Sequence, residues 1–317
     1  MSNQKKNNRK YVEDRIKVAS NIFGTDLKTT EQKLWRSAIS GLPVREYDYG
    51  LSKLDLKAVS RVDTDLMKIV LKQGRTFFGH RSEGKEYALY NQFKSIIPSK
   101  VNGDSYKLAL DVQRRYIDNS LSRYMSRGGI FIEGGCYTGL KAMKWHDLCE
   151  GDCHIIAVEI GAANVEIMRM MLEANNISTI IPVHAGLWRE DGEMEQKHSF
   201  TTRRFLEKTD RWEKWMRFSE KVETLSIDTL LNRQNVDVAD YMNVQVNGAE
   251  IEVLRGFRDI NRVKVIDIAA HYSKGNEKNI DVVREILVDR DYKIIHADKS
   301  TRIAAISPKW KGSIKAK

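Results

Sequence analysis

The chain has 317 residues with 41% apolar and 30% charged side chains and a formal net charge of +10, which fits a globular protein with a full core. No apolar run reaches the roughly 20 residues of a membrane helix, the first ten residues hold no secretory-signal segment, and the three cysteines lack the spacing of a disulfide framework or a zinc site. These features argue against an integral membrane protein and a disulfide-framed one, and we expect a cytoplasmic location.

The positive charge is concentrated at the two ends of the chain. Residues 1–10 and residues 309–317 hold four Lys or Arg side chains each and no acid, which leaves only +2 for residues 11–308. We expect both segments to be solvated, disordered tails. A loose electrostatic attraction to nucleic acid or to an anionic surface is the alternative.

After the first tail, residues 11–125 show helical spacing. Apolar residues recur at three- and four-residue intervals over residues 31–42, 63–74 and 104–125, and the last two segments begin at Asp or Ser in a capping position. Loop signals such as Gly41-Leu42-Pro43 separate the segments. The spacing predicts an N-terminal helical extension, to which the sequence assigns no role.

The pattern changes after Ser126, where short β-branched runs alternate with amphipathic segments up to residue 308. The expected strands are at residues 130–134, 154–160, 179–186, 238–246, 263–271, 292–297 and 301–307. Such alternation is typical of a parallel sheet that is buried on both faces. We therefore predict a doubly wound, mostly parallel, seven-stranded α/β domain over residues 126–308, in which the last two strands form an antiparallel hairpin.

An insertion at residues 194–224 interrupts this alternation with basic and aromatic side chains, among them Arg203, Arg204, Trp212 and Trp215. At the carboxyl edge of a parallel sheet, such an insertion often covers the substrate crevice, and the two arginines would then contact the substrate. Two other interpretations stay open. The segment can be an amphipathic helix that packs by its aromatic side chains, or its rings can stack on nucleotides.

The glycine-rich segment Glu133-Gly134-Gly135-Cys136-Tyr137-Thr138-Gly139 follows a predicted strand and precedes a predicted helix. Glycines at such a bend let the backbone approach a ligand, and the following helix N-terminus favours a polar or negatively charged group. The next strand ends near Glu159, where a carboxylate can accept hydrogen bonds from the two hydroxyls of a ribose. Together the two elements predict a cofactor that contains a nucleoside.

Residues 133–139 and 154–176 resemble motifs one and two of class I S-adenosylmethionine-dependent methyltransferases. Later segments narrow the resemblance to the FkbM-type methyltransferases. Residues 179–193 are similar to their third-strand segment, residues 225–231 to their Leu-Asp-x-Leu-Leu segment, and residues 240–257 to their signature Asp-x-x-Lys-Ile-Asp-Val-Glu-Gly-Ala-Glu-x-x-x-Leu-x-Gly. The resemblance covers residues 128–306.

This resemblance implies a Rossmann-like fold, S-adenosyl-L-methionine as the cofactor, and methyl transfer to a hydroxyl, commonly on a sugar or a natural-product scaffold. It places the methionine end of the cofactor at the glycine-rich segment, the ribose at Glu159 and the adenine beside Ala185 and Gly186. The residues expected to bind the cofactor are Glu133, Gly134, Gly135, Cys136, Tyr137, Gly139, Glu159, Ile160, Ala185 and Gly186.

The chain departs from the family signature at three positions, where Asn243, Gln245 and Asn247 stand in place of Lys, Asp and Glu. Because a neutral amide is a poor ligand for a hard cation, we expect no catalytic metal. The amides offer both donors and acceptors, so they would bind a polyhydroxyl or amide substrate. The alternative is that the site has lost methyl transfer and the domain serves as a scaffold subunit.

A general base for a hydroxyl acceptor must then come from another residue. His271 directly follows the fifth strand, at the edge where acceptors bind, and Glu250 and His184 are alternatives. Asp228, which precedes Thr229, is expected to be a helix N-cap.

The sequence therefore predicts a metal-independent S-adenosylmethionine-dependent methyltransferase that acts on a hydroxyl of a small-molecule or glycan acceptor. An RNA or protein methyltransferase that uses the insertion and the basic tails is a second hypothesis. A methyltransferase-fold scaffold without turnover is the third.

Overall fold

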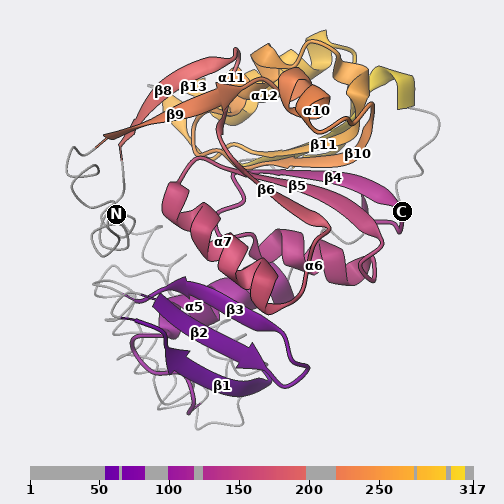
Figure 1. Cartoon of the computed structure of the whole chain (residues 1–317). Helices are drawn as coiled ribbons and strands as arrows, with labels where there is room; N and C mark the ends of the chain where they lie inside the picture. The colour runs from indigo at the N-terminus through magenta and orange to yellow at the C-terminus, as the bar shows by residue number, and fades with distance from the viewer. Residues whose placement is uncertain are drawn as a thin grey trace, which may run out of the picture. The chain divides into compact units, whose positions relative to one another are not determined.

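The computed structural model describes residues 54–63, 66–82, 99–117, 124–197, 219–274, 277–297 and 301–310. The chain divides into two compact units, residues 1–117 and residues 118–317 (Figure 1). The helix predicted at residues 31–42, the first tail and Arg203 and Arg204 lie outside the described residues.

In the first unit, the described residues form a three-stranded antiparallel sheet in which β2 (Leu66–Leu71) lies between β1 (Leu56–Arg61) and β3 (Thr76–His80). The helix predicted at residues 63–74 is therefore wrong. The run LMKIVL pairs with a strand on each side, and these non-local backbone bonds outweigh its local helical spacing.

The last predicted helix of this region is confirmed where the structure describes it. Residues 106–117 form α5 (Tyr106–Asp111), which continues into the π-helical turn η2 (Val112–Ile117). Tyr106, Leu108 and Val112 are buried, so this helical segment is buried on more than one side.

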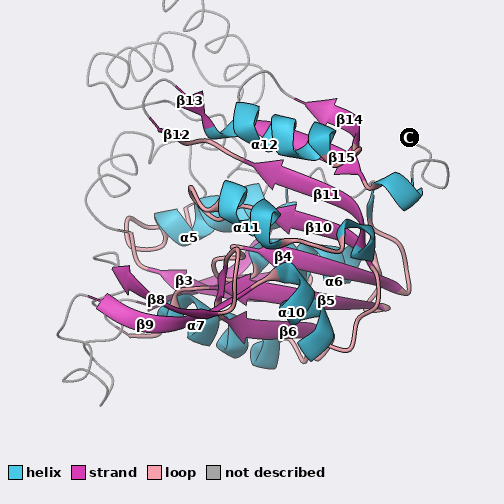
Figure 2. Cartoon of the chain, turned by 90° about the horizontal axis from the view of Figure 1, so that it is seen from above, coloured by secondary structure: helices cyan, strands magenta, loops and turns pink. Residues whose placement is uncertain are grey.

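The second unit is built on a seven-stranded sheet, which confirms the predicted α/β fold. The strand order is β14-β15-β11-β10-β4-β5-β6, and β15 is antiparallel to both of its neighbours (Figure 2). The strands are β4 (Gly129–Gly134), β5 (Cys153–Glu159), β6 (Ile180–His184), β10 (Ala239–Val244), β11 (Val263–Ala269), β14 (Lys293–Ala297) and β15 (Arg302–Ile306). The pairing of β14 with β15 also confirms the closing hairpin.

Helices cover both faces of this sheet. On one face lie α6 (Leu140–Leu148) and α7 (Ala162–Ala174), and on the other lie α10 (Ile227–Arg233), α11 (Glu250–Gly256) and α12 (Asn279–Asp289) (Figure 1). Short 3-10 turns, η4 (Ile260–Arg262) and η5 (Pro308–Trp310), follow α11 and β15. No helix in the described part of the chain is both long and apolar enough to cross a membrane.

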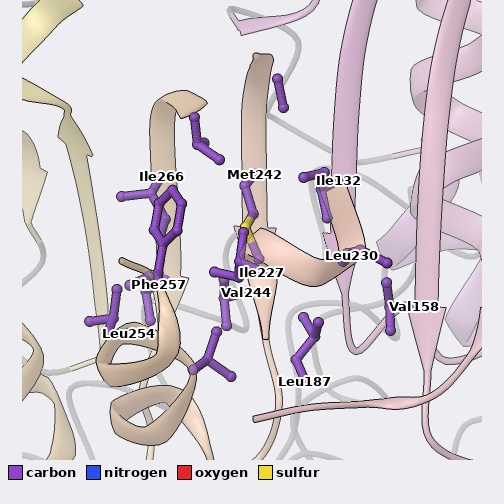
Figure 3. Packing of buried hydrophobic residues seen from close by; sticks show 14 of the residues in the cluster. Ile132, Val158, Leu187, Ile227, Leu230, Met242, Val244, Leu254, Phe257 and Ile266 are labelled. Atoms are coloured by element: carbon purple, nitrogen blue, oxygen red, sulfur yellow. The ribbon is translucent and has the colours of Figure 1, made fainter. Parts of the chain in front are cut away.

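Successive side chains of each strand point to opposite faces of the sheet, and the two faces carry different layers of side chains. One layer is the main apolar core, in which strand residues such as Ile132, Met242 and Ile266 pack against Leu230 and Phe257 of the helical layer (Figure 3). The opposite layer is more polar and aromatic. It holds three buried rings in edge-to-face contact, with Trp145 packed against both Phe131 and Tyr241.

The ends of the insertion form strands, not the helix that was one of the alternatives. β8 (Gly192–Lys197) and β9 (Ser219–Leu225) pair antiparallel, and β7 (Gly186–Leu187) joins β9 to make a small three-stranded sheet. A further two-stranded ribbon, β12 (Ser273–Lys274) with β13 (Glu277–Lys278), precedes α12. Residues 198–218 lie outside the described residues.

The helix that follows β9 begins differently from the prediction. Ser226 is the N-cap of α10, and its side-chain oxygen accepts a hydrogen bond from the Thr229 N–H. Asp228 is instead in the first turn, where its carboxylate accepts hydrogen bonds from the backbone N–H groups of Arg258 and Asp259. The N-cap prediction for Asp228 is therefore wrong, because its side chain ties α10 to the loop after α11.

Candidate active site

The candidate site lies at the carboxyl ends of the parallel strands. β4 continues through α6 to β5 on one side, while β10 lies on the other side of β4, so the chain changes direction between β4 and β10. At such a switch point the loops after neighbouring strands turn away from each other and leave a crevice. The loop after β4 and the end of β10 therefore lie together at this switch point.

The loop after β4 has three residues with positive φ, namely Gly135 (75°), Tyr137 (57°) and Gly139 (76°). Its start is fixed by the Gly135 and Cys136 N–H groups, which both donate to the carbonyl oxygen of Val158, at 2.9 and 3.0 Å. A Cβ atom added to Gly135 would lie 2.0 Å from the carbonyl oxygen of Gln245. The loop backbone therefore lies directly against the chain that leaves β10, which requires glycine.

Glu159 joins this loop to the next helix. Its Oε2 accepts a hydrogen bond from the Tyr137 N–H at 2.8 Å, and its Oε1 accepts from the Gly161 N–H at 3.0 Å and from the Asn164 amide at 3.2 Å. The carboxylate is 9% exposed, so these charge-assisted bonds operate in a partly dry environment. Glu159 thus holds the glycine-rich loop and the start of α7 in one arrangement.

The other end of the loop is set by packing. A Cβ atom on Gly139 would lie 2.6 Å from the sulfur of Met168 on α7, so a larger residue does not fit there. Cys136 is buried beside the same sulfur at 3.9 Å. Burial, together with Glu133 and Glu159, holds the pKa of the Cys136 thiol well above its ordinary value. Cys136 is therefore a packing residue and not a nucleophile.

Glu133, the last acidic residue of β4, is buried beside a lysine. The Lys141 ammonium, from the first turn of α6, lies 3.6 Å from Glu133 Oε1 and donates to Asn243 Oδ1 at 2.5 Å. The Asn243 amide nitrogen in turn donates to the carbonyl oxygen of Asp267 on β11. Asn243 is 1% exposed, and both of its amide atoms are bonded within the chain.

The turn after β6 brings small residues beside the end of β5. The Ala185 N–H donates to the Glu159 carbonyl oxygen at 3.1 Å, and His184 Nε2 lies 3.1 Å from the Ile160 carbonyl oxygen. A Cβ on Gly186 would lie 3.1 Å from Ile160 Cδ1. The residues predicted to bind ribose and adenine therefore lie next to each other, and the bond to the backbone gives His184 a role in holding this turn.

The chain that leaves β10 makes a tight turn at Asn247 and Gly248, with φ of 52° and 109°. The Gly248 N–H donates to both carboxylate oxygens of Glu250, at 2.9 and 3.0 Å, and the Asn279 amide lies 3.4 Å from one of them. Glu250 is 1% exposed, and both of its carboxylate oxygens accept a hydrogen bond within this turn. Its contacts indicate that it holds the turn.

Exposed side chains are found at the same edge. His271 and Asn247 are exposed, and Gln245 is half-buried. Tyr272 is 51% exposed, and its ring lies 3.8 Å from where a Cβ on Gly248 would be, so it covers the turn after β10. The ends of β10 and β11 therefore both lead to exposed polar side chains, and Tyr272 lies over the turn that follows β10.

The structure thus brings most of the predicted residues to one edge of the sheet, and it adds three that the sequence did not single out. These are Lys141, Asn164 and Asn279, and each acts on another predicted site residue, namely Glu133, Glu159 or Glu250. Lys141 lies two residues after the last glycine of the loop, which was the one sequence signal available for it. Among the described residues, no group of three or more His, Cys, Asp and Glu side chains could hold a metal ion.

Residues 134–294, just over half of the chain, match the model of the "Methyltransferase FkbM domain". No curated protein sequence matches the chain.

Among solved structures, three similar ones are methyltransferases or related proteins. Precorrin-6y C5,15-methyltransferase from Geobacter metallireducens has a TM-score of 0.38 at 13% identity, over 59% of this chain and 84% of that one. Aeropyrum pernix fibrillarin, solved with bound S-adenosyl-L-methionine, has a TM-score of 0.36 at 15% identity, over 80% and 100%. TrmK from M. capricolum, solved with S-adenosyl-homocysteine, has a TM-score of 0.37 at 11% identity, over 62% and 69%.

Proposed function

The chain belongs to the FkbM methyltransferase family and is an S-adenosyl-L-methionine-dependent methyltransferase, and we propose that it methylates a hydroxyl of a sugar-like or other polyhydroxyl acceptor without a metal ion. The single observation that carries this proposal is the carboxylate of Glu159, which gathers the backbone of the glycine-rich loop and the start of α7 at the edge of the sheet. The same edge carries exposed polar and aromatic groups.

The residues of the glycine-rich loop fit the cofactor. The loop is held in one conformation by bonds from its Gly135, Cys136 and Tyr137 N–H groups to β5, and it leads into the N-terminus of α6, which favours a polar or negatively charged group of a ligand. Glu133 is on β4, directly before this loop, and its carboxylate would bind the ammonium group of the methionine moiety. Cys136 and Tyr137 complete the loop beside it, together with Gly134.

The nucleoside part would lie beside the ends of β5 and β6. Glu159 would accept a ribose hydroxyl in addition to, or in exchange for, the Tyr137 N–H that it holds at 2.8 Å. Ile160, Ala185 and Gly186 offer a small apolar surface for the adenine ring.

The acceptor would bind across the ends of β10 and β11. Gln245 and Asn247 each offer a donor and an acceptor for hydroxyl groups, and the exposed face of Tyr272 offers an apolar platform for a ring. A neutral amide at position 245 is a poor ligand for a hard cation, which supports a reaction without metal. This combination of aromatic and amide groups favours a polyhydroxyl ring over an extended charged substrate.

The cofactor supplies an electrophilic methyl group on a sulfonium when it is bound. The residues of this chain then have two tasks, which are alignment of the acceptor hydroxyl with that methyl group and removal of its proton. His271 is exposed at the carboxyl edge, directly after β11, and we assign it the role of the general base that removes the proton of the acceptor hydroxyl. The assignment predicts that replacing His271 with Gln lowers kcat while leaving cofactor affinity unchanged.

A second candidate is methylation of RNA or protein. The insertion at residues 194–224 carries Arg203, Arg204 and two tryptophans, which are suitable for backbone phosphates and stacked bases. The ribbon of β8 and β9 leads into this basic segment. This candidate requires affinity for the acceptor that falls steeply with salt.

Calorimetric titration with S-adenosyl-L-methionine and S-adenosylhomocysteine tests the proposal. Wild type should bind both, and Glu159→Ala should bind at least about tenfold more weakly, since it loses charge-assisted bonds to the loop and the ribose. Glu223→Ala is a matched control, because that carboxylate forms an exposed ion pair with Arg233. Absence of heat with wild type would overturn the proposal.

Turnover with a panel of polyhydroxyl acceptors, with and without EDTA, then tests the acceptor class. Methylation of a sugar hydroxyl that EDTA does not slow is the expected result. Methylation of RNA or protein alone, or a rate that depends on added divalent cation, would contradict it.

A further inference from the structure

A buried cation on α6 is an unassigned feature of the site. The Lys141 side chain is 11% exposed and the Glu133 side chain 1%, and their charged atoms lie 3.6 Å apart. Lys141 also donates to Asn243 Oδ1 at 2.5 Å. Because burying a charge is costly unless it is paired, each of these two side chains lowers the cost of burying the other.

The strand register explains how the pair is oriented. Glu133, Asn243 and Asp267 lie side by side on β4, β10 and β11, so their side chains face the same layer. Each outer carboxylate has its own cation, since Arg302 binds Asp267 at 2.6 Å and Lys141 lies beside Glu133. The Asn243 amide between them turns its oxygen toward Lys141 and its nitrogen toward the Asp267 carbonyl.

Position 243 is also where the FkbM signature has a lysine. Since Asn243 is the direct neighbour of Glu133 in the register, a lysine side chain at position 243 could reach the same carboxylate. In this chain the strand carries a neutral amide, and the ammonium comes from α6. The ammonium group beside Glu133 therefore comes from the helix and not from the sheet, and Asn243 is its hydrogen-bond acceptor.

We propose that Lys141 is a positioning residue that keeps Glu133 ionised and directed to the glycine-rich loop, so that Glu133 can bind the ammonium group of the cofactor. The inference rests on the proposed cofactor site. A buried carboxylate without a cation favours its protonated form, which has no charge to offer a cationic ligand. Loss of Lys141 therefore weakens cofactor binding without removing any atom that touches the cofactor.

The inference makes a specific prediction about two positions. Lys141→Gln leaves Glu133 without its cation, and Asn243→Lys alone places a second ammonium beside Lys141. Each single change should weaken S-adenosyl-L-methionine binding about tenfold, whereas Lys141→Gln/Asn243→Lys should bind within about threefold of wild type. A role for either residue in packing alone gives losses that add and no such recovery.

The measurement is calorimetric titration of the full chain with S-adenosyl-L-methionine, with thermal unfolding of each variant as a check of folding. Lys144→Gln is the matched control, because it neutralises a lysine one turn later on α6 and should leave affinity unchanged. Glu133→Gln/Lys141→Gln removes both charges together, so this variant should unfold near the wild-type temperature. It should still bind S-adenosyl-L-methionine more weakly than wild type, because the carboxylate for the cofactor ammonium is gone.

Recovery of binding in Lys141→Gln/Asn243→Lys supports the inference, even if Lys141→Gln alone does not fold. Wild-type affinity in Lys141→Gln, or a combined variant that binds no better than the single ones, overturns it. If wild type itself binds no cofactor, the proposed function fails first. The unfolding temperatures of the charge-removal variants then still show whether Lys141 and Glu133 are coupled.

Discussion

Replacement of Gly135 by alanine tests the central geometric feature of the site, the contact between the glycine-rich loop and the end of β10. Gly128 offers a matched comparison, because it precedes β4 and also has a positive φ, 70° against 75° for Gly135. A Cβ on Gly128 would meet nothing within 4 Å, whereas one on Gly135 would lie 2.0 Å from the Gln245 carbonyl oxygen and 2.8 Å from its carbon.

The two substitutions share one cost and differ in another. An alanine in the left-handed region costs roughly 1–2 kcal/mol at either position. At Gly135 the new methyl group also collides with backbone, which cannot rotate away as a side chain can, and overpacking adds about 1–3 kcal/mol or more. We therefore expect Gly128→Ala to destabilise the unit by about 1–2 kcal/mol and Gly135→Ala by about 2–5 kcal/mol.

Thermal unfolding and cofactor titration are the assays. Each kcal/mol corresponds to about 2–4 °C for a unit of this size, so the midpoints of the two variants should differ by several degrees. Gly135→Ala should also lose measurable S-adenosyl-L-methionine binding, because the loop must move away from β10, while Gly128→Ala should retain it. Equal midpoints and equal affinities would refute the close approach of loop and strand.

Two further predictions concern the polar layer of the sheet. Asp267→Asn should cost about 1.5–3 kcal/mol in urea unfolding, because it leaves the half-buried Arg302 without its carboxylate. Glu223→Gln, in an exposed pair, should cost about 0–1 kcal/mol, and equal losses in the two variants would contradict this. Burial, followed by the charge of Asp267, raises the pKa of Tyr241 well above its ordinary 10.0. Since the folded chain keeps a proton that the unfolded chain releases, stability from this group is complete below about pH 10 and falls as the pH rises further. Unfolding in urea at rising pH should show a shallower alkaline decline for Tyr241→Phe, and parallel declines would contradict the assignment.

The second unit was predictable because its strands carry their own signal. Runs such as IFI and HIIAV are β-branched and apolar on both sides, which is what a central strand of a parallel sheet requires, and the sheet buries them. The first unit lacked such a signal. LMKIVL has apolar residues at helical intervals, and it is a strand because it pairs with β1 and β3. These partner strands lie outside the run, so the spacing of its own residues does not reveal the pairing.

The candidate site was predictable where a backbone conformation forces the residue type. Gly135 and Gly139 have positive φ and close neighbours at the position of a Cβ atom, so glycine is favoured at both positions. The spacing of these glycines in the sequence therefore predicted the loop. Lys141 was not predictable in this way. Its role depends on Asn243, more than a hundred residues later in the chain, which only the folded sheet places beside it.

Two of the three amides that depart from the family signature have a physical explanation. Asn243 is a buried bridge between Lys141 and β11, so its neutrality belongs to a network that obtains its cation elsewhere. Asn247 has a φ of 52°, a conformation that asparagine tolerates better than most residues. Nothing in the structure explains the side chain of Gln245, whose backbone meets both Gly134 and Gly135 at the switch point.

A single loss of function would not produce this pattern. A decaying site has no reason to keep Glu133 paired, to retain glycine where a methyl group would collide with Gln245, or to hold Glu159 on three donors. In the proposed site, the neutral side chains Gln245 and Asn247 belong to the acceptor side, while close contacts fix the backbone on the cofactor side. This asymmetry favours a changed acceptor over a lost reaction, and it identifies Gln245 as the position where acceptor specificity should respond most to substitution.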